Sequence, residues 1–260
     1  LGLPATGARR IDGIGAGIFG VGASSSIRGI ALGGIGVGVG GDLTGIAIGG
    51  IGVGGGGDVR GISIGGIGVG TGGNLHGLSI GGVGVGTGGN ARGILIGGIG
   101  AGVGGDVEGI SVGGIGVGAG GNMRGLSIGG VGIGAGGNVT GVQLAGIGIG
   151  SGGTLKYVSI AGVGIGAPRI EGLAIASAVG AQNVHAVVIA PIYFKIDDGQ
   201  MNGLNISAWN NIHGTQRGLA IGLYNYARSL DGLQIGILNY AGNKSRGTRV
   251  LPLINYARTH

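Results

Sequence analysis

The sequence contains no cysteine and has little proline, few charges and few aromatic residues. Of its 260 residues, 4 are proline, 9% are charged and 3% are aromatic. Without cysteine, the chain has no disulfide, no thiolate nucleophile and no cysteine-ligated zinc. The scarcity of proline and the lack of a Gly-X-Y register exclude a collagen triple helix. The fold therefore has to come from 77 glycines and from aliphatic residues.

The charges do not form a patch for nucleic acid. The net charge is +6, but the arginines occur singly along the chain and are not interleaved with aromatic residues. Nucleic-acid-binding surfaces gather basic residues on one face, so we expect no nucleic-acid partner. The hydrophobic content of 43% is too high for a disordered glycine linker, and we therefore predict a folded chain.

A strict period of 16 residues organises the chain. Repeats open at residues 13, 29, 45, 61, 77, 93, 109, 125, 141 and 157, and degenerate repeats of 14 to 17 residues open at 172, 186, 203, 218, 232 and 247. Numbered from 1 to 16, the positions read Gly, apolar, small, apolar, Gly-Gly, apolar, Gly, apolar, Gly, variable, Gly-Gly, Asn/Asp, apolar, polar. We predict a polar N-terminal segment (1–12), regular repeats (13–171) and degenerate repeats that form a C-terminal cap (172–260).

Each repeat changes phase at its central glycine pair. In the repeat that opens at Gly77, Leu78 and Ile80 have even numbers, whereas Val83 and Val85 have odd numbers. One uninterrupted strand would point these two pairs to opposite faces. A corner at the glycine pair, where glycine adopts angles closed to other residues, would turn both pairs toward one core. We therefore expect positions 2, 4, 7, 9 and 15 to point inward and positions 3, 8 and 10 outward.

Two all-β architectures fit such repeats. In a β-solenoid each repeat is one coil, and about sixteen short coils stack. In a sixteen-stranded up-and-down β-barrel each repeat is one strand with a bulge at the glycine pair. Membrane barrels carry aromatic girdles and long loops on one side, whereas residues 13–156 contain one aromatic residue, Phe19, and turns of equal length. We predict the solenoid, with the barrel, an outer-membrane pore, as the alternative.

Candidate chemical motifs are explained by the repeat itself. Matches to Gly-x-Gly-x-x-Gly follow from the glycine content, and GNKS at 242–245 lacks the residue order of a phosphate loop. The Gly-Gly-Asp turns are similar to calcium-binding glycine-rich rolls, but half of the turns carry Asn and the period is not nine. The Asn/Asp residues are expected to form hydrogen bonds with the turn backbone.

The other polar residues also give no candidate site. Only two threonines align, too few for the row of outward threonines that ice binding needs: Thr71 and Thr87. The histidines and one acidic pair are expected to be solvated: His76, His185, His213, His260, Asp197 and Asp198. We predict no catalytic residue, no cofactor-binding residue, no metal ligand and no enzyme activity.

The C-terminal third exchanges glycine for larger residues. Three segments there end in Asn-Tyr-Ala: GLAIGLYNYA (218–227), GLQIGILNYA (232–241) and LPLINYA (251–257). We expect their asparagines, Asn225, Asn239 and Asn255, to bond one another in a ladder. These segments resemble a group of exported bacterial surface-repeat proteins built from GLQIGLxN units, which finish on Leu-Pro-x-x-Asn. The resemblance implies export to a bacterial cell surface or outer membrane and carries over no functional residues.

The sequence thus predicts a non-catalytic structural or adhesive surface repeat protein that self-associates. A solenoid ends in open strand edges that recruit other strands, and we expect the N-terminal coils to be the joining edge, behind the polar segment 1–12. Lateral contact is expected on faces made smooth by outward serines: Ser63, Ser79, Ser111, Ser127 and Ser159. Val37 and Ile51 are expected inside the early coils. The sequence identifies no ligand, and membrane contact stays open under the barrel alternative.

Overall fold

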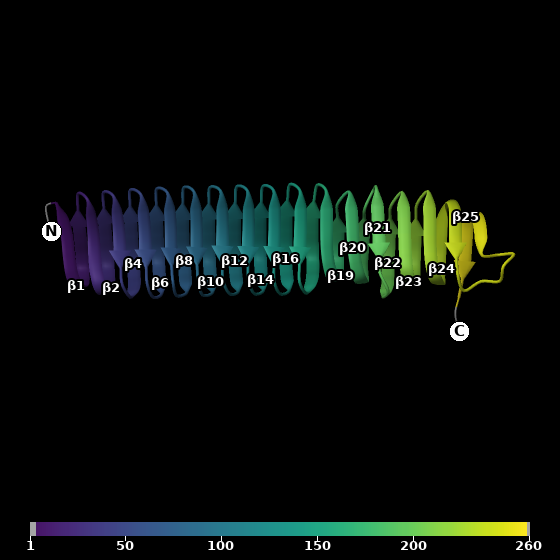
Figure 1. The fold of residues 1–260 in the computed structure, drawn as a ribbon, viewed down its shortest axis with the longest axis horizontal. Helices are drawn as coiled ribbons and strands as arrows, with labels where there is room; N and C mark the ends of the chain where they lie inside the picture. Colours follow the sequence, from purple (N-terminus) through teal and green to yellow (C-terminus); the bar gives the residue numbers. More distant parts are fainter. Residues whose placement is uncertain (1–3, 259–260) are drawn as a thin grey trace. The chain divides into compact units, whose positions relative to one another are not determined.

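The computed structural model describes residues 4–258, which form strands and turns without a helix. Contacts divide the chain into two compact parts, an N-terminal body (Leu1–Ala135) and a C-terminal body (Gly136–His260). Within each body, strands of successive coils pair in parallel (Figure 1), and only the last strand of the C-terminal body departs from this pattern among the described residues.

Each regular coil of the N-terminal body has one longer and one four-residue strand. The longer strands are β1 (Ala5–Gly17), β2 (Gly20–Gly33), β4 (Asp42–Gly49), β6 (Val59–Gly65), β8 (Leu75–Gly81), β10 (Ala91–Gly97), β12 (Val107–Gly113) and β14 (Met123–Gly129). The short strands are β3 (Gly36–Val39), β5 (Gly52–Gly55), β7 (Gly68–Thr71), β9 (Gly84–Thr87), β11 (Gly100–Val103), β13 (Gly116–Ala119) and β15 (Gly132–Ala135). Ile62 pairs with Leu78, and Leu78 pairs with Ile94, so each residue lies beside its equivalent one repeat later.

The C-terminal body continues this pattern with longer strands and then closes it. Its strands are β16 (Val139–Ala145), β17 (Gly148–Ser151), β18 (Thr154–Ala161), β19 (Gly164–Ile175), β20 (Ala178–Ile189), β21 (Tyr193–Ile196), β22 (Gln200–Ile206), β23 (Trp209–Ile221), β24 (Tyr224–Ala241) and β25 (Val250–Ala257). β25 pairs antiparallel with β24 and folds back over the last coil.

The fold is therefore the predicted β-solenoid, with about fourteen turns. The repeat that opens at Gly247 is not a coil, since it contributes the antiparallel strand β25. The alternative, a sixteen-stranded up-and-down barrel, is wrong. Such a barrel pairs consecutive strands antiparallel, whereas here parallel partners lie one coil apart.

The first coil begins earlier than expected. Residues from Ala5 onward belong to β1, where Ala5 pairs with Gly20 and Asp12 pairs with Arg28. The segment predicted as a polar cap is thus, from Ala5, a strand of the stack. Within the described residues β1 pairs only with β2, so its other edge is open.

The central glycine pair is a corner, as predicted, but the two sides of the coil face differently than expected. At Gly82 a Cβ would lie 2.0 Å from the carbonyl oxygen of Gly66, so only glycine fits there. Positions 9 and 15 are buried as expected, with Val85 3% and Ala91 2% exposed. Position 3 was expected outside, yet Ser79 is 1% exposed. Position 7 was expected inside, yet Val83 is 46% exposed.

The narrow interior explains this reversal. At Gly15, in position 3, a Cβ would lie 3.1 Å from the side chain of Val21, in position 9. At Gly129, in position 5, a Cβ would lie 3.1 Å from Ile133, again in position 9. Positions 3 and 5 therefore face position 9 across the core. In the N-terminal body a valine or isoleucine at position 9 therefore stands opposite a small residue at position 3, and the aliphatic side chains of positions 2 and 4 point outward. One coil of the C-terminal body departs from this rule and buries both Gln143 at position 3 and Ile149 at position 9.

Candidate functional site: an apolar outer face

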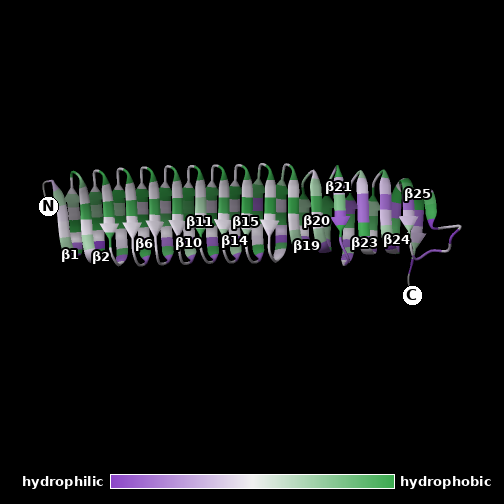
Figure 2. Cartoon of the chain, in the orientation of Figure 1, coloured by the Kyte–Doolittle hydropathy of each residue, from purple (hydrophilic) through white to green (hydrophobic). Residues whose placement is uncertain are grey.

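The outer surface of the longer strands carries two rows of aliphatic side chains. These rows are positions 2 and 4, which alternate with the buried positions 3 and 5. We call them the apolar face, and in the N-terminal body it comprises Ile14, Ile30, Leu32, Ile46, Ile48, Ile62, Ile64, Leu78, Ile80, Ile94, Ile96, Ile110, Val112, Leu126 and Ile128. Parallel register keeps each row straight, and Figure 2 shows the hydrophobic residues as bands that run from coil to coil.

A ridge of aliphatic residues borders this face at the corner. It consists of position 7 in successive coils: Ile35, Ile51, Ile67, Val83, Ile99, Ile115 and Val131. Each amide donates to the equivalent carbonyl of the preceding coil, as from Ile67 to Ile51 at 2.6 Å and from Val83 to Ile67 at 2.6 Å. Ile51, predicted inside, is 51% exposed because its side chain points away from the corner. The ridge widens the apolar surface.

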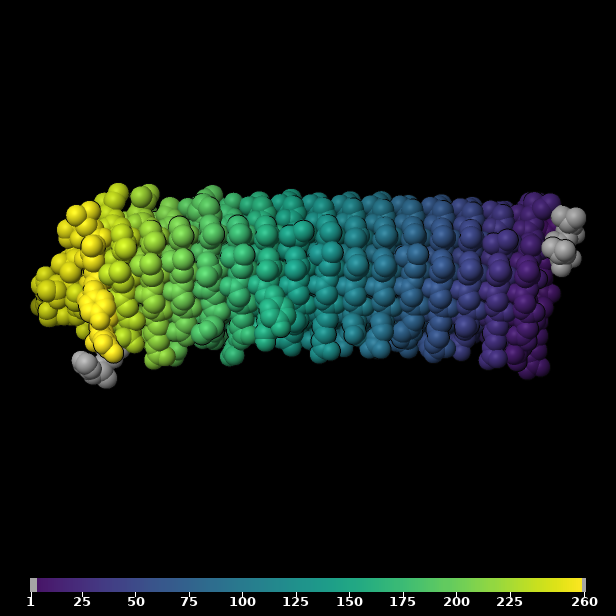
Figure 3. All heavy atoms as spheres, turned by 180° about the vertical axis from the view of Figure 1, so that it is seen from behind, coloured from purple at the N-terminus to yellow at the C-terminus, as the bar shows by residue number. Residues whose placement is uncertain are grey.

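The outer surface of the short strands is bare backbone. Positions 8 and 10 are glycine throughout the regular coils of the N-terminal body. At Gly102 and Gly118, both in position 10, a Cβ would meet nothing within 4 Å. The packing of the chain itself therefore does not require glycine at these two positions. The space-filling view in Figure 3 shows residues of successive coils aligned in straight rows. The predicted outward serines are absent from both outer surfaces, since all are buried: Ser63, Ser79, Ser111, Ser127 and Ser159.

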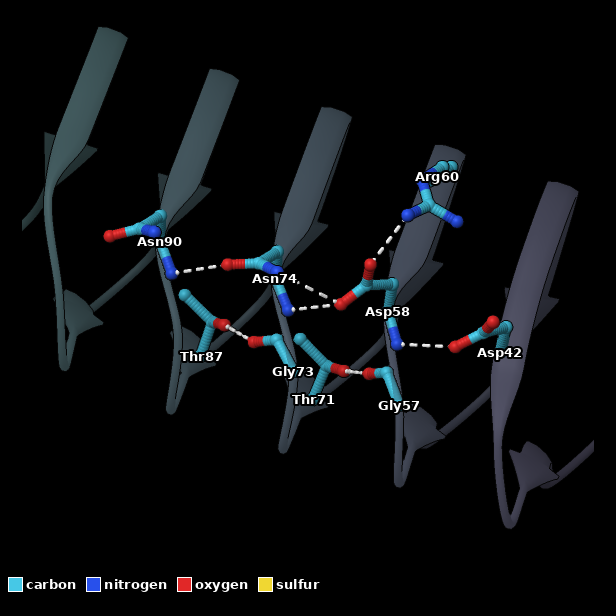
Figure 4. Close-up of polar contacts among 9 residues, drawn as sticks. All are labelled: Asp42, Gly57, Asp58, Arg60, Thr71, Gly73, Asn74, Thr87 and Asn90. Carbon is cyan, nitrogen blue, oxygen red and sulfur yellow. Dashed lines mark hydrogen bonds and ion pairs between the residues drawn. The ribbon is translucent and has the colours of Figure 1, made fainter.

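Asparagine and aspartate residues form a ladder along the second turn. The amide of Asp58 donates to Asp42 Oδ1 at 2.8 Å, and the amide of Asn74 donates to Asp58 Oδ1 at 2.8 Å (Figure 4). This hydrogen bond from Asn74 is the main reason that the pKa of Asp58 lies below its ordinary value of 3.8. The ladder confirms the predicted turn role of these residues.

The aligned threonines contribute to the same turn from inside. Thr71 and Thr87 are 8% and 7% exposed, and their hydroxyls donate to the carbonyl oxygens of Gly57 and Gly73 (Figure 4). They therefore present no outward rank to a surface.

A row of polar and charged side chains flanks the apolar face at position 16. Arg92 lies beside Glu108 in the ladder, and their side chains form an ion pair at 2.6 Å. Arg60 instead pairs with Asp58 in its own coil at 2.5 Å. A groove of about 330 Å³ runs along this row, lined in part by His76, Arg92 and Glu108. The opposite charges of Arg92 and Glu108, in neighbouring coils, offset the repulsion between like charges along this row, as expected for a stack of coils.

The buried asparagine ladder of the C-terminal body is partly as predicted. Asn225 Nδ2 donates to Asn239 Oδ1 at 2.6 Å, which confirms that pair. Asn255 lies on the antiparallel strand and donates to the backbone oxygen of Asn239 at 3.4 Å. The ladder begins one coil earlier, at Asn210, whose Nδ2 donates to Asn225 Oδ1 at 2.6 Å. Asn210 lies outside the predicted ladder because Asn211 and Ile212 stand where the Asn-Tyr-Ala segments have tyrosine and alanine.

The acidic pair and His213 have surface partners, whereas the Nδ1 atom of His76, expected to be solvated, is buried without a hydrogen-bond partner among the described residues. Asp197 pairs with Lys195 at 2.5 Å, and Asp198 pairs with Arg228 at 3.6 Å. The His213 ring packs edge-on against a tyrosine. His76 and His185 belong to different bodies, and His260 lies outside the described residues.

Neither the described residues nor comparisons with known proteins point to another site. Across residues 4–258, no three His, Cys, Asp or Glu side chains gather in a way that could hold a metal ion. The same residues contain no helix long and apolar enough to cross a membrane. Comparison with protein-family models, curated proteins and solved structures found no match. The apolar face is thus the feature with the clearest capacity for interaction.

Proposed function

We propose that this chain is a non-catalytic structural repeat protein of a bacterial cell surface, which associates through its apolar face. The location rests on the GLQIGLxN-like segments of the C-terminal third. The structural role is supported by the stacked coils, and the association is supported by the apolar face. Its side chains are aliphatic and offer no group for acid-base or nucleophilic chemistry.

The continuous exposure of aliphatic side chains is the observation that carries the proposal. Ile46, Ile62, Ile94 and Ile110 are each 37% or 38% exposed and lie in one row. Complete burial of such a side chain removes about 60–120 Å² of apolar surface from water. At roughly a third exposed, the fifteen residues of the face present about 500 Å². The largest apolar patch of a monomer is about 300–600 Å² and is often functional.

A matched pair of variants tests this proposal. The triple variant Ile62→Thr, Ile94→Thr and Ile110→Thr makes the row polar, while threonine keeps the branched shape that suits a strand. The control is Gly70→Ser with Gly102→Ser, which adds side chains to the opposite surface. Both should retain the wild-type circular dichroism.

Association is measured by sedimentation velocity and by retention on vesicles and on alkyl-coated surfaces. We expect wild type and control to associate and the triple variant to remain free. Equal association of the triple variant and wild type would refute a role for this face, as would a wild type that binds neither itself nor any surface.

A further inference from the structure

We propose that the apolar face of the N-terminal body packs against the apolar face of a second copy. The two stacks lie side by side, with their coil axes parallel and with equivalent coils opposite each other. This inference rests on the proposed function and names the partner of the same face.

The spacing of the rows favours a second copy over other partners. Along each row, a side chain recurs once per coil, since Ile62, Leu78 and Ile94 pair directly across parallel strands. Strands in a sheet are about 4.8 Å apart. A partner must repeat at the same interval to receive side chains from eight successive coils without mismatch. A second copy has the same interval because it has the same coils. The side chains of two facing sheets with matched repeats can interdigitate, as in paired cross-β layers.

The area reaches the lower limit for a specific interface. Two faces of about 500 Å² each bury about 1,000 Å² in total, the size at which specific interfaces begin. The ridge residues lie outside this area, at the edge of the face, with Ile67 at 53% and Ile115 at 55% exposed. Neither row of the face contains a charged residue in the N-terminal body, so pairing leaves no charge of these rows unpaired.

The charged row at position 16 decides the orientation. This row flanks one side of the face and contains four arginines, Arg28, Arg60, Arg92 and Arg124, against two acidic residues, Asp12 and Glu108. With antiparallel coil axes, the two rows would meet along one edge, where their like charges repel. With parallel axes, a twofold rotation about the stack direction places the rows at opposite edges, both in water. Position 2 of one copy then faces position 4 of the other.

Cross-linking can test this geometry cleanly because the chain has no cysteine. One preparation mixes the single variants Leu78→Cys and Ile80→Cys, which occupy positions 2 and 4 of the same coil. A second mixes Ile46→Cys and Ile110→Cys, both in position 2 but four coils apart. A short bismaleimide bridges the roughly 10 Å between facing sheets. Circular dichroism checks that each variant folds.

We expect the first mixture to cross-link at least tenfold faster than the second. Gly86→Cys, on the opposite surface of the same coil as Leu78, should cross-link no faster than the second mixture. Faster linking of the second mixture would refute the parallel arrangement, and equal rates in all preparations would refute the pairing of faces. If either of these results were found and the triple Ile→Thr variant had lost association, the proposed function would still hold. The apolar face would then be a docking surface with another geometry or another occupant.

A charge variant provides a second test that does not depend on cysteine chemistry. Ile94→Lys places a cation in the centre of the face, and Gly102→Lys places one on the opposite surface of the same coil. By sedimentation equilibrium, we expect Ile94→Lys to raise the dimer dissociation constant at least tenfold and Gly102→Lys to leave it within twofold. Monomeric wild type that binds lipid vesicles would overturn the second copy as the partner in favour of a membrane surface.

Discussion

The pair Leu95 and Ala101 offers the sharpest test of the narrow interior. Most regular coils place a small residue at position 3 and valine or isoleucine at position 9, as with Ser79 and Val85. In the coil that opens at Gly93 the sizes are exchanged, with Leu95 at position 3 and Ala101 at position 9. Both are buried, at 0% and 3% exposed. If these positions face each other, the exchange keeps the filled volume constant.

Two single variants disturb this balance in opposite directions. Leu95→Ser leaves a cavity, and truncation of a buried leucine costs about 2–5 kcal/mol of stability. Ala101→Val adds two methyl groups against Leu95, and overpacking costs about 1–3 kcal/mol. The double variant restores the serine and valine of the neighbouring coils, so its cost should fall below that of either single change. The coupling energy should therefore be at least as large as the cost of Leu95→Ser, about 2–5 kcal/mol.

Local stability is the quantity to measure, because stacks of repeats need not unfold in one step. Hydrogen exchange of the amides in residues 91–105 reports the free energy of opening for this coil. As a control, Leu95→Ser is combined with Val53→Ala, a position 9 residue three coils away, where the effects should add within about 0.5 kcal/mol. Additive effects of Leu95→Ser and Ala101→Val would show that the two positions do not face each other, and the account of the narrow interior would be wrong.

Three further predictions follow from burial, space and charge. Val37→Asp should open the early coils because it buries an unpaired charge at a position 3% exposed, whereas Ile51→Asp should be tolerated; limited proteolysis distinguishes them. Gly114→Ala places a Cβ 2.0 Å from a carbonyl oxygen and should destabilise by about 1–3 kcal/mol, while Gly118→Ala, in open space, should stabilise by about 0.5–1 kcal/mol in thermal melts. Because the pKa of Asp58 is lowered in the folded chain, the contribution of its carboxylate to stability is present above pH 3.8 and is lost as the pH falls through the folded-state pKa. Hydrogen exchange of the Asn74 amide, which donates to this carboxylate, should become faster over that pH range in wild type but not in Asp58→Asn.

The sequence alone was sufficient to predict the solenoid, its corner and its turn. The 16-residue period sets the length of one coil, and parallel stacking then aligns identical positions. The change of phase at Gly81-Gly82 predicted a corner, and in the structure a Cβ at Gly82 would lie 2.0 Å from a carbonyl oxygen. Asp58 and Asn74 predicted turn chemistry, since short polar side chains bond to nearby backbone. These features are local, and local rules were enough to predict them.

Only the tertiary structure decided which side of each strand is inside. Alternation shows that Leu78 and Ile80 share one face and Ser79 the other, but it does not say which face meets the core. Hydrophobicity favoured Leu78 and Ile80, and that interpretation was wrong. The opposing strand places Val85 so close that only a small side chain fits at Ser79, and the larger residues are left outside. The apolar face therefore arises from the width of the coil, a distance that depends on two strands together and that neither strand's sequence specifies.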